Sequence, residues 1–258
     1  IMPCNGLTYA PPHNCACYPE AKLYGLNVLA PASASRSLPD KVAAAGRLER
    51  AALEKEKSDP HTADDWPTYR HDPARSGATA TELSTKLGVA WETKMGGRLS
   101  ALTIAAGRVY VAQVDAHAVH ALQETTGERL WSFTAGGRVD SPPTYHRGSL
   151  LFGSADGWVY CLQASTGKLK WRFRAAPRDR RLMAFEQLES VWPVHGSILV
   201  QDDVASFVAG RSNYLDGGLR LYRLEANHGK LLSETIIDEK DPETGENLQG
   251  RLKILGLL

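Results

Sequence analysis

The sequence predicts an all-β fold, a β-propeller of four-stranded antiparallel blades, with about three blades, one extra strand and a short linker helix. Three observations predict it. Trp91, Trp131 and Trp171 are separated by a constant interval of 40 residues, which is the length of a propeller blade. The segments that end at the last two tryptophans align, with a Thr-Gly pair at the same place in each. Between the turns, apolar and polar residues alternate as in short strands.

The second repeat shows how one blade divides into strands. Residues 149 to 155, 158 to 163 and 168 to 174 have the pattern of its last three strands, and an inner strand precedes them at about 141 to 146. The Thr-Gly pair that ends at Gly167 supplies the last turn, because glycine adopts a positive φ without strain. Gly127 has the same role in the first repeat.

A third repeat runs from about Ser197 to Ile237 but departs from the pattern. His228-Gly229 replaces the Thr-Gly pair, and Ser233 stands at the tryptophan position. Upstream, Gly88 to Met95 is expected to form a single outer strand that carries Trp91. Three blades and a strand cannot close a ring, since propellers need at least about four blades. The sequence is therefore expected to be a fragment of a longer chain, or the remaining blades are supplied by another chain.

The segments around the blades predict further units. Residues 1 to 33 have the pattern of half a blade with a cysteine-bearing loop, and residues 34 to 63 are predicted to be a linker. The blades are expected to span residues 64 to 238, and residues 239 to 258 to begin further propeller sequence. Within the linker, helical spacing of apolar residues over residues 40 to 57 predicts a short amphipathic helix. These apolar residues are Val42, Ala45, Leu48, Ala52 and Leu53.

Three of the four cysteines crowd the first segment. A disulfide between Cys4 and either Cys15 or Cys17 would suit an oxidising compartment. Inert free thiols and a zinc site are the alternatives, although no CxxC pair or suitably spaced histidine accompanies these cysteines. Cys161 stands alone and is expected to be a buried free thiol.

Composition excludes some classes of partner. A formal net charge of +1 produces no broad field for nucleic acid or an anionic membrane. No stretch has the length of a transmembrane helix. We therefore expect neither a nucleic-acid partner nor a membrane-spanning segment in this sequence.

Common catalytic motifs are absent from the sequence, including GxSxG, the Walker loop, GxGxxG and HExxH. His117 and His120 would point to opposite faces of a strand, which argues against a shared metal. Asp202-Asp203 falls at a predicted hairpin turn, where a solvated turn is favoured over a calcium site. No catalytic residue and no metal site is predicted.

The third repeat is longer than the others in two places. It has about sixteen extra residues between Trp171 and Ser197 and about seven more near residues 211 to 218. Because the chain crosses the disk once per strand, both insertions should lie on one face, opposite the turns at Gly127 and Gly167. Long loops on a rigid scaffold often carry binding residues.

These insertions are expected to bind a protein or a small anionic ligand, since they combine arginines with aromatic side chains. The alternative is that they cover the end of the channel or pack on a missing blade, with their charges paired internally. The candidate binding residues are Arg178, Arg180, Arg181, Glu186, Trp192, Arg211, Asn213 and Asp216.

The unit Ala-x-x-x-x-Thr-Gly-x-x-x-Trp that ends at Trp131 resembles the tryptophan-docking motif of the PQQ-like repeat family. That family includes quinoprotein dehydrogenases, which use pyrroloquinoline quinone (PQQ), and the BamB-type outer-membrane assembly lipoproteins. Residues 65 to 77, from Asp-Trp-Pro-Thr-Tyr to Arg-Ser-Gly, look like the lead-in of these propellers. The resemblance implies a noncatalytic binding or scaffolding module in the periplasm or at the cell surface.

The alternative that the resemblance leaves open is part of a PQQ-dependent oxidoreductase. In those enzymes an adjacent Cys-Cys pair, a stacking tryptophan and calcium hold the quinone. Here Cys15-Ala16-Cys17 replaces adjacent cysteines, and no CxxCH haem motif is present. No cofactor is therefore expected, and PQQ with calcium would be bound only under the alternative.

Overall fold

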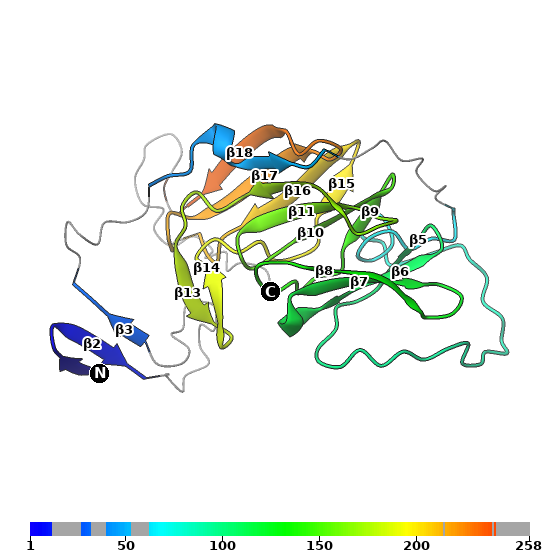
Figure 1. The fold of residues 1–258 in the computed structure, drawn as a ribbon. Coiled ribbons are helices and arrows are strands. Elements are labelled where there is room, and N and C mark those ends of the chain that lie inside the picture. Colours follow the sequence, from blue (N-terminus) through cyan, green and yellow to red (C-terminus); the bar gives the residue numbers. More distant parts are fainter. Residues whose placement is uncertain (12–26, 32–39, 53–61, 214, 239, 241–258) are drawn as a thin grey trace.

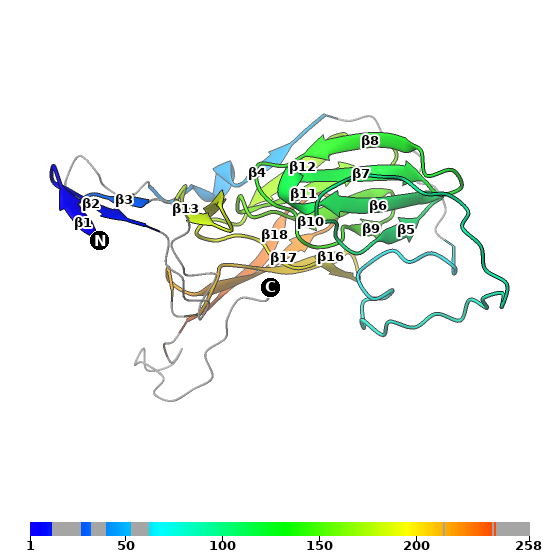
Figure 2. The same cartoon turned by 90° about the horizontal axis from the view of Figure 1, so that it is seen from below.

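The computed structural model describes residues 1–11, 27–31, 40–52, 62–213, 215–238 and 240. This part of the chain is all-β apart from short 3₁₀ turns, as predicted, and three four-stranded antiparallel units follow one another along it (Figures 1 and 2). We name them blades A, B and C.

Each blade is a meander in which consecutive strands pair. Blade A contains β5 (Thr103–Ala105), β6 (Arg108–Gln113), β7 (Ala118–Gln123) and β8 (Arg129–Thr134). Blade B contains β9 (Thr144–His146), β10 (Ser149–Gly153), β11 (Trp158–Gln163) and β12 (Leu169–Arg174). Blade C contains β15 (Leu199–Gln201), β16 (Val204–Ala209), β17 (Leu219–Glu225) and β18 (Leu231–Ile237).

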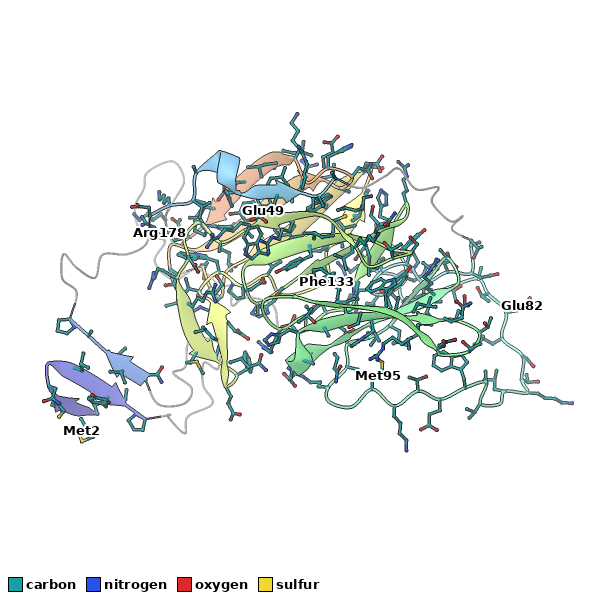
Figure 3. All side chains as sticks on the ribbon, viewed as in Figure 1. Met2, Glu49, Glu82, Met95, Phe133 and Arg178 are labelled. Carbon is teal, nitrogen blue, oxygen red and sulfur yellow. The ribbon has the colours of Figure 1, made fainter. Side chains whose placement is uncertain are left out.

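Two apolar clusters fill the spaces between the blades (Figure 3). Because side chains alternate along a strand, β11 contributes to both. Tyr160 and Leu162 pack in the cluster shared with blade A, whereas Val159 and Cys161 pack in the cluster shared with blade C. Blade B is consequently buried on both faces.

The predicted tryptophan docking is confirmed three times. Each tryptophan donates its indole N–H to a carbonyl of the next unit along the chain, and its ring lies over that unit's turn glycine. A Cβ at Gly167 would lie 2.6 Å from ring carbons of Trp131, and one at Gly229 would lie 2.7 Å from those of Trp171. The three bonds are Trp91 to Glu124 O (2.8 Å), Trp131 to Ala164 O (3.0 Å) and Trp171 to Ala226 O (3.2 Å).

The turn glycines are required on two counts. Gly127, Gly167 and Gly229 have φ values of +70°, +71° and +68°, which side chains with a Cβ rarely adopt. A Cβ would also collide with the docked ring. The degenerate third repeat has the same register, since Ser233 pairs with Arg223 where Trp171 pairs with Cys161.

The predicted linker helix is wrong in its described part. Residues 40–52 contain only the 3₁₀ turn η3 (Ala44–Gly46) and a short strand, β4 (Leu48–Arg50). β4 pairs antiparallel with β12 as a fifth strand of blade B. The intrinsic helix preference of a short segment is weak. Hydrogen bonds to the open edge of β12 and burial of Leu48 outweigh it. Residues 53–57 lie outside the described residues.

The predicted outer strand over Gly88 to Met95 is also wrong. No ladder bonds form there, and among the described residues no strand pairs with this segment. A strand exists only where a neighbour accepts and donates its backbone hydrogen bonds. Trp91 is therefore docked on blade A through its side chain alone.

The N-terminal residues form a small separate sheet of β1 (Met2–Cys4), β2 (Leu7–Ala10) and β3 (Asn27–Leu29), which lies apart from the blades in Figures 1 and 2. Cys4 is exposed, and Cys161 is a buried free thiol. Cys15 and Cys17 lie outside the described residues, so the disulfide stays a prediction. Residues 239 and 241–258 also lie outside them, and the further propeller sequence expected there stays a prediction.

Candidate functional site

One face of the blade array gathers the connections between blades and those joining second to third strands. Backbone hydrogen bonds link them in sequence, from Ala135 N–H to His117 O, Ala155 N–H to Arg138 O, Ser190 N–H to Ala155 O and Gly210 N–H to Pro193 O. We name this surface the loop face. The sequence correctly predicted that both insertions of the third repeat emerge here.

The first insertion folds into a hairpin of β13 (Arg181–Ala184) and β14 (Gln187–Ser190). Its tip residues Phe185 and Glu186 have φ values of +49° and +62°, as a tight hairpin turn requires. The hairpin is a compact element on the loop face rather than an irregular loop.

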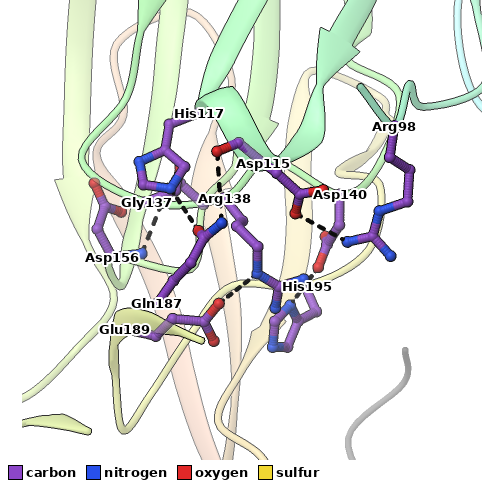
Figure 4. A network of polar contacts seen from close by, with 11 residues as sticks. Arg98, Asp115, His117, Gly137, Arg138, Asp140, Asp156, Gln187, Glu189 and His195 are labelled. Carbon is purple, nitrogen blue, oxygen red and sulfur yellow. Dashed lines mark hydrogen bonds and ion pairs between the residues drawn. The ribbon is translucent and has the colours of Figure 1, made fainter. Parts of the chain in front are cut away.

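Buried charges hold this hairpin on the face (Figure 4). Arg138, from the β8–β9 connection, donates from Nε to Glu189 Oε1 at 2.5 Å, and both side chains are 3% exposed. The ring of Phe185 covers the same guanidinium, with its centroid 4.1 Å from Cζ. His117 Nε2 and Gln187 Oε1, 2.6 Å apart, add a second contact to blade A. Removal of either charge would leave its partner buried and unpaired.

The second insertion meets the first at Asp216. Arg211 forms an ion pair with one carboxylate oxygen of Asp216, and Arg180 lies 3.3 Å from the other. The indole N–H of Trp192 donates to Asp216 O at 3.1 Å. These four predicted residues are thus brought together, and they are largely bonded to one another. Internal pairing, the alternative considered from the sequence, describes Arg211 and Asp216 best.

The other candidate residues differ in exposure. Arg181 and Glu186 are exposed on the hairpin, with Leu188 beside them at 53% exposure. Arg178 is half-buried at the start of the insertion, and Asn213 is half-buried in the second one. The exposed hairpin residues are therefore the part of the predicted set that a partner can reach.

Sequence reasoning missed a carboxylate–histidine pair on this face. Asp140 Oδ2 lies 2.8 Å from His195 Nδ1 (Figure 4). Burial raises the pKa of the Asp140 carboxyl, but the hydrogen bond and charge of His195, with the charge of Arg138, outweigh burial and lower it. No local motif joins residues so far apart, so the sequence held no signal for this pair.

Asp156, in the β10–β11 turn, was missed as well. It accepts hydrogen bonds from the Tyr160 hydroxyl at 2.5 Å and from the backbone N–H of Gly136 at 3.0 Å. Burial nevertheless raises its pKa above the ordinary value. The Asp156-Gly157 pair is a turn signal that could have marked this position. Its hydrogen bonds fix the turn against the β8–β9 connection.

The carboxylates of this face do not fit a calcium–quinone centre. Asp140 is bonded to His195, Asp156 to Tyr160 and Glu189 to Arg138. Calcium needs six to eight oxygen ligands. Within the described ranges, no group of three or more His, Cys, Asp or Glu side chains is arranged to hold a metal ion.

Two minor predictions concern other polar residues. His117 lies not on a strand but just after the turn η4 (Val114–Ala116), with φ +57°, whereas His120 is buried on β7. Asp203 lies in the predicted hairpin turn and accepts hydrogen bonds from Arg147 at 2.7 and 2.9 Å. His146 Nε2 lies 2.7 Å from the same carboxylate. This carboxylate is therefore already bonded to Arg147 and contacts His146.

The chain matches the family model described as "Outer membrane protein assembly factor BamB" over residues 74–135 and 115–232. This match covers more than half of the chain, which therefore belongs to this family of PQQ-like repeat propellers. No curated protein matches the chain.

Solved structures with the same fold include the europium-containing methanol dehydrogenase, at 18% identity and a TM-score of 0.56, covering 71% of this chain and 33% of that one. The quinohemoprotein alcohol dehydrogenase from Pseudomonas putida HK5 is similar at 17% identity and a TM-score of 0.57, covering 70% and 28%. The quinohemoprotein alcohol dehydrogenase from Comamonas testosteroni is similar at 20% identity and a TM-score of 0.53, covering 69% of this chain and 28% of that one. The chain thus spans about a third or less of each relative, and the likeness shows the propeller fold.

The described residues include no helix that is both long and apolar enough to cross a membrane.

Proposed function

We propose that this chain is a noncatalytic binding module whose loop face captures a protein partner, with the β13–β14 hairpin as the main contact. The observation that carries the proposal is the way the hairpin is held. The buried Arg138–Glu189 pair and the Phe185 ring fix its inner side, while Arg181, Glu186 and Leu188 remain exposed on its outer side.

A rigid contact element suits binding because little conformational entropy is lost on association. Its exposed side presents an apolar leucine between charges of both signs, which suits a protein surface better than a small anion. The arginines that could have held an anion, Arg180 and Arg211, already share the Asp216 carboxylate. The partner class that fits is therefore a protein.

The proposed location is outside the cytoplasm, in the periplasm or at the cell surface. The family's description as an outer membrane assembly factor supports it. The clustered cysteines near the N-terminus agree with an oxidising compartment. Fractionation of the native host, with the chain detected by antibody, tests this location. Recovery in the cytoplasmic fraction would contradict it.

The hairpin is tested by exchanging its exposed leucine. Leu188→Asp should remove an apolar contact of about 1.4 kcal/mol. This loss corresponds to an affinity about tenfold lower, so partner capture should fall about tenfold. Leu232→Asp is the matched control, because Leu232 on β18 has nearly the same exposure, 51% against 53%. Capture is measured by quantitative cross-linking in cell-envelope extract, with melting temperatures for both variants. Equal capture by the two variants would contradict the proposed contact.

The competing function is part of a PQQ-dependent oxidoreductase, which the fold shared with the quinohemoprotein alcohol dehydrogenases favours. The two functions are distinguished by adding PQQ and calcium to the purified chain and measuring its melting temperature. A specific cofactor at 100 times its Kd would stabilise the fold by about 2.7 kcal/mol. We expect no such rise in melting temperature.

A further inference from the structure

The outer rim between blades B and C carries a feature that the proposed function does not use. Residues 42–52, which we name the strap, cross this rim and contribute β4 to the edge of β12 (Figure 1). The backbone N–H of Val42 donates to Pro177 O, and that of Ala51 donates to Lys170 O. The strap is thereby bonded along the whole edge of the blade.

The side chain of Arg47 enters the gap between the two blades and is 8% exposed. Its Nε donates to Arg174 O at 2.9 Å, and Nη2 donates to Ala175 O at 3.1 Å and to the Tyr222 hydroxyl at 2.6 Å. Nη1 forms an ion pair with Glu234 at 2.8 Å. All three nitrogens are bonded, in the fork geometry that a guanidinium presents and a lysine does not.

Two aromatic rings complete the pocket. The Arg47 Cζ lies 4.9 Å from the ring centroid of Phe173 and 5.1 Å from that of Tyr222. The next residue, Leu48, packs on the apolar cluster between the blades, and its Cδ1 lies close to Gly229. The pocket therefore holds an arginine followed by an apolar residue.

The remaining contacts of the strap are on its exposed side. Glu49, labelled in Figure 3, pairs with Arg172 at 2.7 Å. Arg50 donates to His228 O at 3.0 Å. Exposed pairs of this kind contribute little to affinity. Arg47 and Leu48 are thus the two anchors.

The strap adds a fifth strand to a repeat unit that has four strands elsewhere among the described residues. Blade A has four strands and, among the described residues, no fifth strand on the edge of β8. It nevertheless has the same register and the same irregularity between its third and fourth strands as blade B. A blade therefore forms without a strap, and the strap occupies its edge in the manner of a bound peptide.

The equivalent place between blades A and B carries different charges. The pair Tyr222–Glu234 of blade C corresponds to Tyr160–Arg172 of blade B. The glutamate that pairs with Arg47 is therefore replaced there by an arginine, and the Tyr160 hydroxyl is already bonded to Asp156. The set of groups that holds Arg47 thus belongs to one rim position and is not a general property of the repeat.

We propose that this rim pocket is a recognition site for an extended peptide that carries an arginine followed by an apolar residue, and that the strap fills it as a tethered ligand. Affinity comes from strand addition to β12, and specificity comes from the guanidinium pocket. The site lies at the outer rim, beside the start of the β12–β15 connection, and does not depend on the function proposed for the loop face.

The test uses a labelled peptide of residues 41–52 and two versions of the full chain. In the Arg47→Ala/Leu48→Asp variant both anchors of the strap are lost, so the added peptide should bind. In the wild-type chain the strap competes at an effective concentration of about 1 mM, and peptide binding should be at least about tenfold weaker. Fluorescence anisotropy measures both.

Two controls test the arginine itself. A peptide with Arg47→Ala should not bind the emptied chain, and adding Glu234→Arg to that chain should abolish binding of the natural peptide. Failure of the natural peptide to bind the emptied, folded chain overturns the proposal. Equal binding of the two peptides overturns the arginine pocket.

Folding of the emptied chain is followed by its melting temperature. If the variant is destabilised, saturating natural peptide should raise that temperature and the Arg47→Ala peptide should not. Absence of this difference also overturns the proposal. A wild-type dimer that the emptied variant does not form would place a second copy's strap in the pocket and overturn the tethered arrangement.

Discussion

The two faces of the blade array are built on different principles. On the turn face, one contact repeats three times, with a tryptophan of one unit docked on the glycine of the next. On the loop face backbone bonds recur from blade to blade, but the side-chain contacts do not. Pairs such as Arg138–Glu189 and Asp140–His195 are particular to one place and join segments about fifty residues apart. The turn face therefore maintains the propeller, whereas the loop face is free to vary and to carry binding.

The largest effect is expected on the turn face. Trp171 is 1% exposed, and Trp171→Ala should lower the free energy of unfolding by about 3 to 5 kcal/mol. Trp131→Ala should cost less because the Trp131 ring is half-buried. Ser233→Ala, at the degenerate position, should change stability little. Urea denaturation of the three variants measures the order of these losses. A large loss of stability in Ser233→Ala would contradict the assignment of Ser233 to the tryptophan position of the third repeat.

A somewhat smaller loss is expected on the loop face. Glu189→Gln would leave the Arg138 guanidinium buried without its counter-charge and should cost about 3 kcal/mol. Glu186→Gln is the matched control on the same hairpin, where the side chain is exposed and the change should stay within about 0.5 kcal/mol. Equal stability of the two variants would show that the hairpin is not held by this pair.

The contrast between the faces explains what the sequence predicted. Gly127 and Gly167 could be assigned to turns because each follows a local rule, a glycine four residues before a tryptophan. The degenerate blade C was assigned from the same offset, despite Ser233. The position of both insertions followed from topology alone. Periodicity thus predicted the parts of the fold that repeat.

The remainder depends on contacts between distant segments, which no local pattern encodes. Leu48 has helical spacing in the sequence, yet its burial between two blades formed more than one hundred residues later makes it a strand residue. Arg138 and Asp140 gave no signal, because their partners Glu189 and His195 are about fifty residues away. The face on which the insertions emerge could therefore be predicted, whereas the contacts within it could not.

A pH effect should distinguish the largely buried Asp140–His195 pair of the loop face from an exposed pair. The folded-state pKa of Asp140 lies below its ordinary value of 3.8. Its contribution to stability is therefore present above about pH 4 and is lost as the pH falls through the folded-state pKa. Asp140→Asn should therefore make the free energy of unfolding fall less steeply as the pH is lowered below about 4.

Asp115→Asn provides the control for this titration. Asp115 forms an exposed pair with Arg98 at 3.4 Å, and such pairs contribute little. The free energy of unfolding of the Asp115→Asn variant should fall with decreasing pH in the same way as that of the wild type. If both variants show the same pH dependence, the Asp140–His195 pair does not contribute to acid stability.

The smallest effect concerns the thiols, which should report on structure without changing stability. Burial raises the pKa of Cys161 to about 12, so its thiolate is scarce near neutral pH and the folded chain should not be alkylated there. In the unfolded, unreduced chain, two free thiols should react if Cys4 is paired with Cys15 or Cys17. A count of four would remove the disulfide and, with it, the cysteine-based argument for an oxidising compartment.

Because Cys161 packs between blades B and C, its protection in the folded chain also reports whether that gap stays closed. Emptying the arginine pocket at the rim should increase its alkylation rate, whereas Glu186→Gln on the hairpin should leave that rate unchanged.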